Sequence, residues 1–573
     1  MANFAWVIDQ TSCIGCHACT TACKAEHDVP LGVNRTWVKY VETGTFPATR
    51  RQIAVLRCNH CAEPPCVEVC PTRAMVQRPD GIVDFDTDRC IGCKACLQAC
   101  PYDAIYIDPA EHVAEKCNFC AHRVDQGLLP ACVVVCPTES LLFGDLDDPA
   151  SRVSRIVSSR PTTVRRPEQG TRPKAFYLGA SEATLDPLVP VHESAYMWAE
   201  RRTGGAKDHT AELAGWASSV GEVERAAAAA TATLAGIPPL APGRPPGRDG
   251  EDRPAASRAL PVLTLGASGG PRPEPRPAGQ RMPKARVAYD VFHPRPWGWK
   301  VALYLWTKGI GAGAFAIAFL AAALGLASVP RELNLAAAFV SLAGVGITTV
   351  LLVWDLKRPE RFWTILVRPQ LRSWLAIGAF VLVGYSGLLG LWFLGTWFGV
   401  DAGLLALLGW PTVVLAVLAA LYTAFLLGQC EARDLWQNQV TGIVLLAQAT
   451  ILGATAVLAA GAVLGAPDDV VAIARAALLA GALVNVVALV LGEALAEHPT
   501  TNARAAAHLL VRGPYRAGFW LGGVVLAGLL PLVVAALVPA SAAVLTAAGL
   551  AAAAGLLWYE LGFIAAGQAV PIS

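Results

Sequence analysis

Apolar residues are distributed unevenly along this chain, and its second half consists of one long apolar run after another. Each run is close to the ~20 residues that a helix needs to span a lipid bilayer. Gly and Ala are frequent in these runs, which lets helices approach each other closely in lipid. Buried helices of a soluble protein would not produce so many consecutive runs of this length. The pattern predicts an all-α membrane bundle of eight transmembrane helices within residues 291–573, at about 301–327, 335–354, 374–398, 410–428, 440–464, 476–492, 517–537 and 541–566.

The first half has shorter, mixed patterns that predict strands around loops. Short strands are predicted at Phe4–Asp9, Trp37–Val41, Ile53–Leu56 and Ile82–Phe85. Glu139–Asp147 is expected to close this domain, which spans residues 1–185. Arg165–Gly179 is expected to leave it as an extended arm.

A third kind of sequence separates the two halves. From about Thr203 to Arg286 the chain is dominated by Ala, Pro, Arg and Gly. Such a segment cannot bury enough apolar surface to offset the entropy lost on ordering. We therefore expect residues 186–290 to form an extended arm and a linker. An alternative is that its arginines bind anionic lipid head groups.

Composition agrees with a soluble half joined to a membrane half. The chain has 573 residues, too many for one ordinary domain, with 54% hydrophobic and only 16% charged residues. The first 300 residues hold most of the charges. The formal net charge of +2 gives no reason to expect a nucleic-acid partner.

Sixteen of the 17 cysteines lie in four groups of four in the first half. The first and third groups have C-x2-C-x2-C-x3-C spacing, which matches the frame of bacterial iron–sulfur proteins. The second and fourth are variants with a longer middle gap. In the two-cluster proteins with this frame, the fourth cysteine binds the other cluster. The groups therefore predict four [4Fe-4S] clusters in two interlocked pairs on an α+β ferredoxin-like fold, bound by Cys13, Cys16, Cys19, Cys23; Cys58, Cys61, Cys66, Cys70; Cys90, Cys93, Cys96, Cys100; and Cys117, Cys120, Cys132, Cys136.

Two other readings of the cysteines are weaker. A disulfide framework needs an oxidising compartment, yet Met1–Gln10 has no basic region or apolar run typical of a signal peptide. Structural zinc uses paired CxxC units, whereas each pair here is followed by two further cysteines. Gly15 and Gly92 lie inside the CxGC turns, where a Cβ would keep the backbone from approaching the cluster.

The segments "IDQTSCIGCHACTTACKAEHDVP", "RCNHCAEPPCVEVCPTRA", "DRCIGCKACLQACPYDA" and "KCNFCAHRVDQGLLPACVVVCPTESLLFGDLDDP" resemble a known family. They are similar to the four-cluster electron-transfer subunits of molybdopterin oxidoreductases of the polysulfide and dimethyl sulfoxide reductase type. The resemblance implies that cysteine groups one and four share one cluster pair, and groups two and three the other. It also implies a separate catalytic subunit that carries the molybdenum or tungsten pterin, so that no Mo or W is expected in this chain.

A second resemblance covers about residues 290–566. "PWGWKVALYLWTKGIGAGAF" at the first apolar run and "DLKRPERFWTILVRPQLRSW" after the second resemble the integral membrane subunits of the polysulfide reductase and NrfD type. The resemblance implies that the bundle exchanges electrons between an iron–sulfur subunit and a quinone, either menaquinone or ubiquinone. Here the two subunits form one fused chain.

Ionisable side chains near the cysteine-rich end of the bundle are candidates for the quinone site, because they are costly in lipid and often functional there. Interfacial snorkelling is the alternative for any one of them. Glu560, late in the eighth run, falls on the same side. The candidate quinone-binding residues are His293, Tyr304, Lys308, Asp355, Glu431 and Glu493.

Haem b needs axial ligands, normally histidine. The membrane half contains only His293, His498 and His508, and all three lie in flanks or a loop of the predicted bundle. We expect no haem, and direct electron transfer from a cluster to quinone. Cys430 has no cysteine partner nearby and is expected to be a small buried residue.

Positive charge near the helix ends predicts the orientation of the bundle. Eleven Lys and Arg residues lie on the side of the N-terminal domain, and only Arg331 and Arg475 lie on the opposite side. We expect a multi-pass protein of the inner (cytoplasmic) membrane with the iron–sulfur domain facing the cytoplasm. The missing twin-arginine signal agrees with this expectation, although polysulfide reductases face outward.

Together these features predict the electron-transfer and membrane-anchor subunit of a respiratory molybdopterin oxidoreductase. Its partners would be a Mo or W catalytic subunit, the quinone pool and membrane lipid. One alternative is an electron conduit in a larger quinol-oxidising assembly without a pterin subunit. Another is that the membrane half is an inert anchor.

Overall fold

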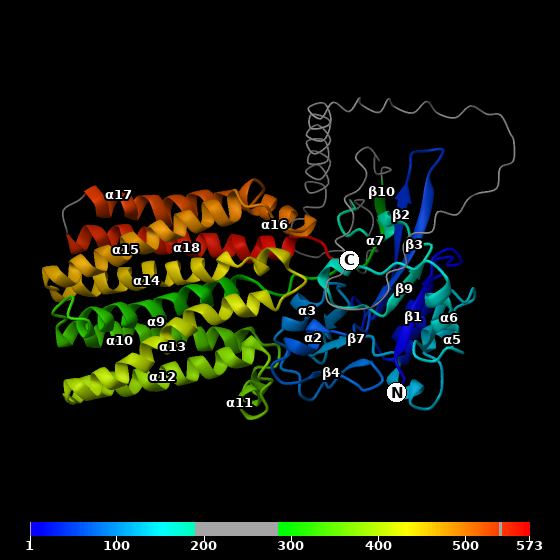
Figure 1. Ribbon diagram of the computed structural model, residues 1–573, viewed down its shortest axis with the longest axis horizontal. Coiled ribbons are helices and arrows are strands. Elements are labelled where there is room, and N and C mark those ends of the chain that lie inside the picture. Colours follow the sequence, from blue (N-terminus) through cyan, green and yellow to red (C-terminus); the bar gives the residue numbers. More distant parts are fainter. Residues whose placement is uncertain (1, 190–284, 538–540) are drawn as a thin grey trace.

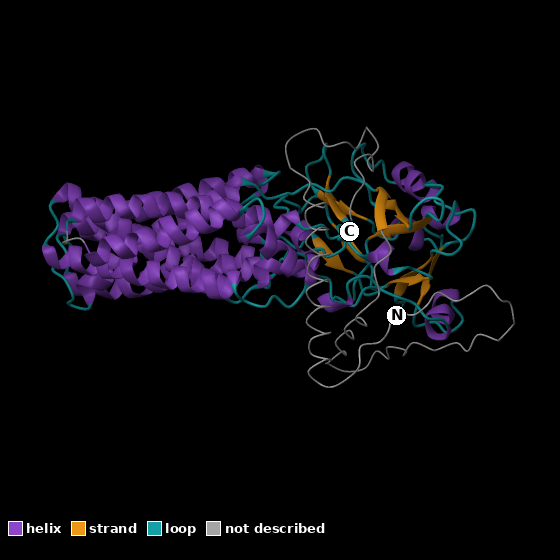
Figure 2. Cartoon of the chain, turned by 90° about the horizontal axis from the view of Figure 1, so that it is seen from above, coloured by secondary structure: helices purple, strands orange, loops and turns teal. Residues whose placement is uncertain are grey.

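The computed structural model describes residues 2–189, 285–537 and 541–573. Strands and short helices form one end of an elongated molecule, and long helices form the other (Figure 1). Seen from above, all strands lie in the same end, and the bundle extends away from it (Figure 2). This division into a cysteine-rich α+β domain and an all-α bundle confirms the predicted fold class.

The first sheet of the cysteine-rich domain is built around the predicted strand β1 (Phe4–Asp9). Strand β8 (Leu141–Asp145) pairs with it antiparallel, and β9 (Ala175–Leu178) pairs with it in parallel. The prediction that Arg165–Gly179 leaves the domain as an arm is wrong. Alternate residues of β9 turn inward, so that Ala175 and Tyr177 are fully buried, and the Tyr177 hydroxyl donates to the Val55 carbonyl at 3.3 Å.

The second sheet has the order β10-β2-β3. Strands β2 (Thr36–Thr43) and β3 (Arg50–Arg57) form the predicted antiparallel pair. Strand β10 (Ala285–Tyr289) falls within the segment predicted to be arm and linker, and that assignment is wrong here. It occupies the open edge of β2 and buries Val287 opposite Val41. The rest of the predicted linker, residues 190–284, lies outside the described residues.

Short elements carry the cysteine loops. Two hairpins pair β4 (Met75–Gln77) with β5 (Val83–Phe85) and β6 (Ile105–Ile107) with β7 (Ala114–Lys116). The helices of this domain are α1 (Ala18–Glu26), α2 (Pro65–Glu68), α3 (Ala95–Ala99), α4 (Ala121–Val124), α5 (Ala131–Val134), α6 (Arg152–Ser159), η1 (Pro167–Gln169) and α7 (Glu182–Leu185).

Gly15 and Gly92 have the left-handed conformations expected of the CxGC turns, with φ values of 69° and 66°. A Cβ on Gly15 would lie 2.9 Å from the Tyr40 ring, and one on Gly92 would lie 2.8 Å from a backbone carbonyl oxygen. Close contact with neighbouring protein atoms therefore adds to the conformational reason for glycine at these positions.

Within the described ranges, eight helical segments are long and apolar enough to cross a membrane, as predicted. The sixth ends in the π-helical segment η4 (Val490–Ala494), and the seventh is the π-helix η5 (Gly518–Leu529) continued by α17 (Leu530–Leu537). Gly313 and Gly453 bring two helices so close that a Cβ on Gly313 would lie 2.0 Å from the Ala449 carbonyl oxygen. The helix of the sixth span is α15 (Asp468–Leu489), and the other spans are α9 (Trp299–Ala323), α10 (Arg331–Asp355), α12 (Trp374–Phe398), α13 (Ala402–Gly428), α14 (Val440–Leu464) and α18 (Ala542–Ala569).

Connections at one end of the bundle dock onto the cysteine-rich domain. The loop after α10 contains η2 (Pro359–Arg361) and α11 (Thr364–Val367). Its backbone N–H groups at Lys357 and Arg358 donate to carbonyls of Gly92 and Ile91 at 3.2 and 3.1 Å. This loop therefore extends onto the third cysteine group. Two further segments at this end are η3 (Asp434–Gln437) and α16 (Thr501–Val511).

Candidate functional site

The sixteen thiols form four sets in space, and each set combines cysteines from two sequence groups. Cys13, Cys16 and Cys19 line a cavity together with Cys136, and the apolar side chains of Val38, Val55 and Leu141 form part of its wall. We call these four thiols the distal set. Its three loop cysteines come from the first sequence group, and its fourth member comes from the last group.

The other three sets follow the same rule. Cys23 interacts electrostatically with the thiols of the fourth sequence group, and Cys100 interacts with Cys58 of the second group. Cys70 in turn interacts with Cys90 and Cys93 of the third group. We define the second set as Cys23, Cys117, Cys120 and Cys132, the third set as Cys58, Cys61, Cys66 and Cys100, and the proximal set as Cys70, Cys90, Cys93 and Cys96. The thiols are thus grouped as the expected pairing requires.

The sets follow one another from the protein surface toward the bundle. Cys16 of the distal set is exposed. Cys117 of the second set interacts with Cys58 of the third, and Cys96 of the proximal set interacts with Cys66 of the third. The proximal set faces the bundle, because Trp297 donates its indole N–H to the Cys93 carbonyl at 3.3 Å.

The surroundings of the thiols fit iron–sulfur clusters. Burial raises the pKa of Cys117 and of Cys100 to about 12, so these thiols need a bound cation to be thiolates at neutral pH. Backbone N–H groups also point at the sulfurs: Ala74 donates to Cys70 at 3.2 Å, and Ala114 donates to Cys90 at 3.3 Å. Such hydrogen bonds are among the features that set cluster potentials.

Histidines next to the cluster cysteines have different environments. The His17 ring is 2.7 Å from the Tyr40 hydroxyl, and the half-exposed His122 pairs with Glu26 at 2.8 Å. His60 is fully buried, and its Nδ1 accepts the backbone N–H of Val83 at 3.1 Å. Each of these three histidines lies one or two residues from a cysteine in the sequence.

Two other side chains reach cluster sulfurs directly. The ring of His27, which follows α1, lies 3.2 Å from the Cys120 sulfur, and the Arg57 guanidinium donates to the Cys132 sulfur at 3.1 Å. Sequence reasoning missed both. Arg57 precedes Cys58 directly, yet it contacts a cysteine 75 residues away.

The junction between the proximal set and the bundle is polar and aromatic. Lys94, inside the third cysteine loop, forms an ion pair with Asp355 at the end of α10, with 2.7 Å between the charged atoms. Trp297 stacks on Trp436 with 5.5 Å between ring centroids. Arg361 of the "RPERF" loop donates to the Cys90 carbonyl at 3.2 Å. Asp355 is therefore neutralised by the cysteine-rich domain itself.

A group of polar side chains lies inside the bundle next to this junction. Lys308 donates a hydrogen bond to Thr423 of α13, and its amine lies 4.5 Å from the centroid of the Tyr422 ring. Electrostatic interactions link Lys308 to Glu560 of α18, and link Tyr304 to Glu560 and Asp355. Lys308 lies nine residues into α9, roughly 13 Å from its start. We call Tyr304, Lys308, Thr423 and Glu560 the bundle polar group.

The structure does not bring all six quinone candidates together. In the described part of the chain, no contact joins His293 or Glu431 to the bundle polar group. His293 lies outside the bundle, 3.5 Å from Asp103 and packed against Trp37. Glu431 follows the end of α13, and burial together with the charges of Glu68 and Glu63 raises its pKa to about 7.

Glu493 has a third environment. It lies in η4, where its carboxylate accepts a hydrogen bond from Asn438 at 3.0 Å. Tyr559 interacts electrostatically with both Glu493 and Glu560, so Glu493 is connected to the bundle polar group through one tyrosine. Cys430 is fully buried, as predicted, and its thiol donates to the Leu426 carbonyl at 3.4 Å.

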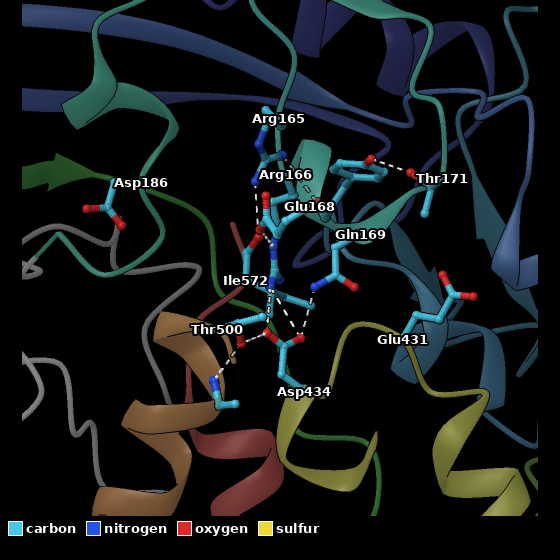
Figure 3. Close-up of polar contacts among 12 residues, drawn as sticks. Arg165, Arg166, Glu168, Gln169, Thr171, Asp186, Glu431, Asp434, Thr500 and Ile572 are labelled. Atoms are coloured by element: carbon cyan, nitrogen blue, oxygen red, sulfur yellow. Dashed lines mark hydrogen bonds and ion pairs between the residues drawn. The ribbon is translucent and has the colours of Figure 1, made fainter. Parts of the chain in front are cut away.

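A second buried polar contact between the two parts surrounds Asp434 of η3 (Figure 3). Arg166 and Gln169 of the cysteine-rich domain reach it from one side, at 3.5 and 3.0 Å, and Thr500 donates to it from the other. Nearby, Arg165 donates to the Ile572 carbonyl at 3.1 Å. These contacts fix the cysteine-rich domain on the bundle and hold the proximal set next to it.

Family models match both parts of the chain. Residues 12–75 and 49–146 each match a 4Fe-4S dicluster domain. Residues 289–572 match the family described as polysulphide reductase, NrfD. The dicluster matches fall on the thiol sets, and the third match covers the bundle.

Individual relatives match about a third of this chain. The chain is 43% identical to a subunit of the tetrathionate reductase of Salmonella typhimurium over 203 residues, which are 35% of this chain and 80% of the relative. It is 42% identical to one of the polypeptides of the polysulfide reductase of Wolinella succinogenes, over 30% of this chain and 93% of the relative. It is also 42% identical to a subunit of the sulfite dehydrogenase of Allochromatium vinosum, over 31% and 83%.

The matches and the geometry agree on the nature of both parts. The cysteine-rich domain has the thiol arrangement of a dicluster protein, and the part of the bundle that the structure describes has eight apolar helices. The chain is therefore a multi-pass membrane protein, and it belongs to the iron–sulfur electron-transfer subunits of the polysulfide and dimethyl sulfoxide reductase type, fused to an NrfD-type membrane domain.

Proposed function

We propose that this chain carries electrons between a separate molybdenum or tungsten catalytic subunit and the membrane quinone pool. In this proposal the distal, second, third and proximal sets each hold one [4Fe-4S] cluster, which supplies one-electron transfer when bound. The observation that supports the proposal is the spatial order of the four thiol sets, from the exposed Cys16 to Cys93 next to the bundle. A series of clusters in this order can carry electrons that enter at one end and leave at the other.

The bundle polar group is the proposed quinone end. A quinone oxygen needs a hydrogen-bond donor and a source of protons as it is reduced. Lys308 and Tyr304 offer N–H and O–H donors, and Glu560 offers a carboxyl group within electrostatic reach of both. Asp355 and Glu493 would act at the margins, because each is held by a partner of its own, Lys94 or Asn438. The quinone is menaquinone or ubiquinone.

The distal end is the proposed entry for the catalytic subunit. The relatives named above are subunits of reductases and a dehydrogenase, so their complexes include other chains. We expect the partner to bind molybdenum or tungsten and to carry the substrate chemistry. The exposed Cys16 places the distal set where an electron can cross between chains.

Metal analysis of the complex purified from its native membrane tests this proposal. We expect about sixteen irons per chain, since sixteen thiolates suit four cubanes, together with molybdenum or tungsten in the co-purifying large subunit and no haem. A complex with full iron but neither Mo nor W would support the alternative of a conduit without a pterin subunit. Cluster reoxidation that is indifferent to quinone-site inhibitors would support an inert anchor.

We also propose that the chain lies in the inner membrane with its cysteine-rich domain in the cytoplasm. The test introduces single cysteines at Phe46, which is 93% exposed on that domain, and at Asp468, the first residue of α15 on the opposite side of the bundle. A membrane-impermeant thiol reagent added to intact cells should label Asp468→Cys and not Phe46→Cys, with the native chain as background. The reverse labelling pattern would refute the orientation.

A further inference from the structure

Arg57, the last residue of β3, is fully buried between two thiol sets. One of its terminal nitrogens donates to the Cys132 sulfur at 3.1 Å. The charges that act on it come from Cys132, Cys117 and Cys19. Two of these thiols belong to the second set and one to the distal set. The guanidinium is therefore placed where two neighbouring cluster sites meet.

The guanidinium is held in a fixed orientation. Its central carbon lies 4.4 Å from the centroid of the Trp6 ring, and Trp6 is itself fully buried in β1. Strand pairing fixes the backbone at this point, because Arg57 is paired with Thr36 of β2. A planar cation stacked on an aromatic ring keeps its N–H groups in one plane.

Within the described residues, no carboxylate pairs with Arg57, and two of its nitrogens, Nε and one terminal nitrogen, have no hydrogen-bond partner. Arg35 of the same domain is different, because it is also buried but pairs with Glu115 at 2.7 Å. Burying a cation without a compensating anion is strongly unfavourable. The environment of Arg57 is therefore incomplete without an anion that contacts the second or the distal set.

A [4Fe-4S] cluster with four thiolate ligands is such an anion, and it gains one more negative charge on reduction. We propose that Arg57 is a fixed countercharge that raises the reduction potential of the cluster in the second set and, to a smaller extent, of the cluster in the distal set. The inference rests on the proposed function, because it requires clusters in these sets. A nearby cation and N–H donors to sulfur stabilise the reduced form more than the oxidised form, so they shift the potential upward.

Redox titration followed by electron paramagnetic resonance tests this assignment in the full complex. Arg57→Gln and Arg57→Met remove the charge; the unbranched Met side chain maintains packing against Trp6 if Gln disturbs assembly. We expect the midpoint of the second-set cluster to move to lower potential, with a smaller shift for the distal cluster and none for the other two. Arg57→Lys keeps a charge and loses the planar donors, so its shift should have the same sign and be smaller.

The matched control is the double variant Arg35→Gln with Glu115→Gln, which removes a buried arginine together with the carboxylate that balances its charge. We expect all four midpoints to stay unchanged in this variant. Unchanged midpoints in Arg57→Gln or Arg57→Met with all four clusters present, or equal shifts of all four, would overturn the inference. If neither neutral variant assembles, an Arg57→Lys protein with native midpoints overturns it. Iron content of the native complex is measured first, and a value far below sixteen per chain would contradict the proposed function instead.

Discussion

The interlocking of the thiol sets makes a prediction that distinguishes spatial grouping from sequence grouping. Cys23 belongs to the first sequence group, but its thiol lies with Cys117, Cys120 and Cys132 of the fourth. It is buried, so solvent cannot easily supply a replacement ligand. Removing Cys23 should therefore affect the second-set cluster and leave the distal cluster of Cys13, Cys16 and Cys19 intact.

Pairs of substitutions give the expected magnitude. Each set holds four thiolates, so each cluster accounts for about four of about sixteen irons. Cys23→Ala with Cys117→Ala removes two ligands from one set and should leave about twelve irons. Cys23→Ala with Cys13→Ala removes one ligand from each of two sets and should damage two clusters, which leaves about eight irons if both are lost.

Iron analysis and spin quantification of the purified full complexes provide the measurement. Cys430→Ala serves as the control, because this buried cysteine lies outside all four sets, and its thiol donates to a backbone carbonyl. That variant should keep all of its iron. The reasoning would be refuted by the opposite result, in which Cys13 and Cys23 together cost one cluster, and Cys23 and Cys117 together cost two.

Three further predictions concern the junction and the bundle. Asp434→Asn breaks the buried pair with Arg166 and should destabilise the chain by about 3–5 kcal/mol, which a lower melting temperature would show. Glu42→Gln breaks an exposed pair with Arg51 and should cost less than about 1 kcal/mol. Equal losses of stability in the two variants would contradict the argument from burial. Burial and two glutamates raise the pKa of Glu431 to about 7, so the folded chain loses stability as pH rises from 4.5 through 7. The melting temperature of Glu431→Gln should exceed that of the native chain at pH 8 and equal it near pH 4.5. An increase in melting temperature of the same size at both pH values would be inconsistent with titration of Glu431. Lys308→Ala should slow quinone-linked cluster reoxidation about tenfold or more while the iron content stays unchanged. Lys300→Ala, which removes an amine over the Trp354 ring, should leave the rate of reoxidation unchanged. A native rate in Lys308→Ala would place the quinone elsewhere.

The sequence alone determined the features that depend on local spacing. An apolar run of about twenty residues is long enough to span lipid as a helix, and the described residues contain eight such helices. Cysteines two and three residues apart lie on one turn of backbone whatever surrounds them, so four cysteine groups could be identified directly. The strand predicted at Phe4–Asp9 has those bounds in the structure, and the one predicted at Trp37–Val41 lies inside β2.

Tertiary structure decided the features that depend on which distant segments meet. Strands β9 and β10 looked like an arm and a linker, because a short strand becomes recognisable only when a sheet edge is available to it. Asp355 looked like a lone charge at the end of an apolar run, but it forms an ion pair with Lys94, 261 residues away. Nothing in the sequence singles out Arg57, since no local pattern shows that its side chain meets Cys132. Local sequence fixes backbone conformation, whereas the environment of a charge is fixed by packing between elements far apart in the chain.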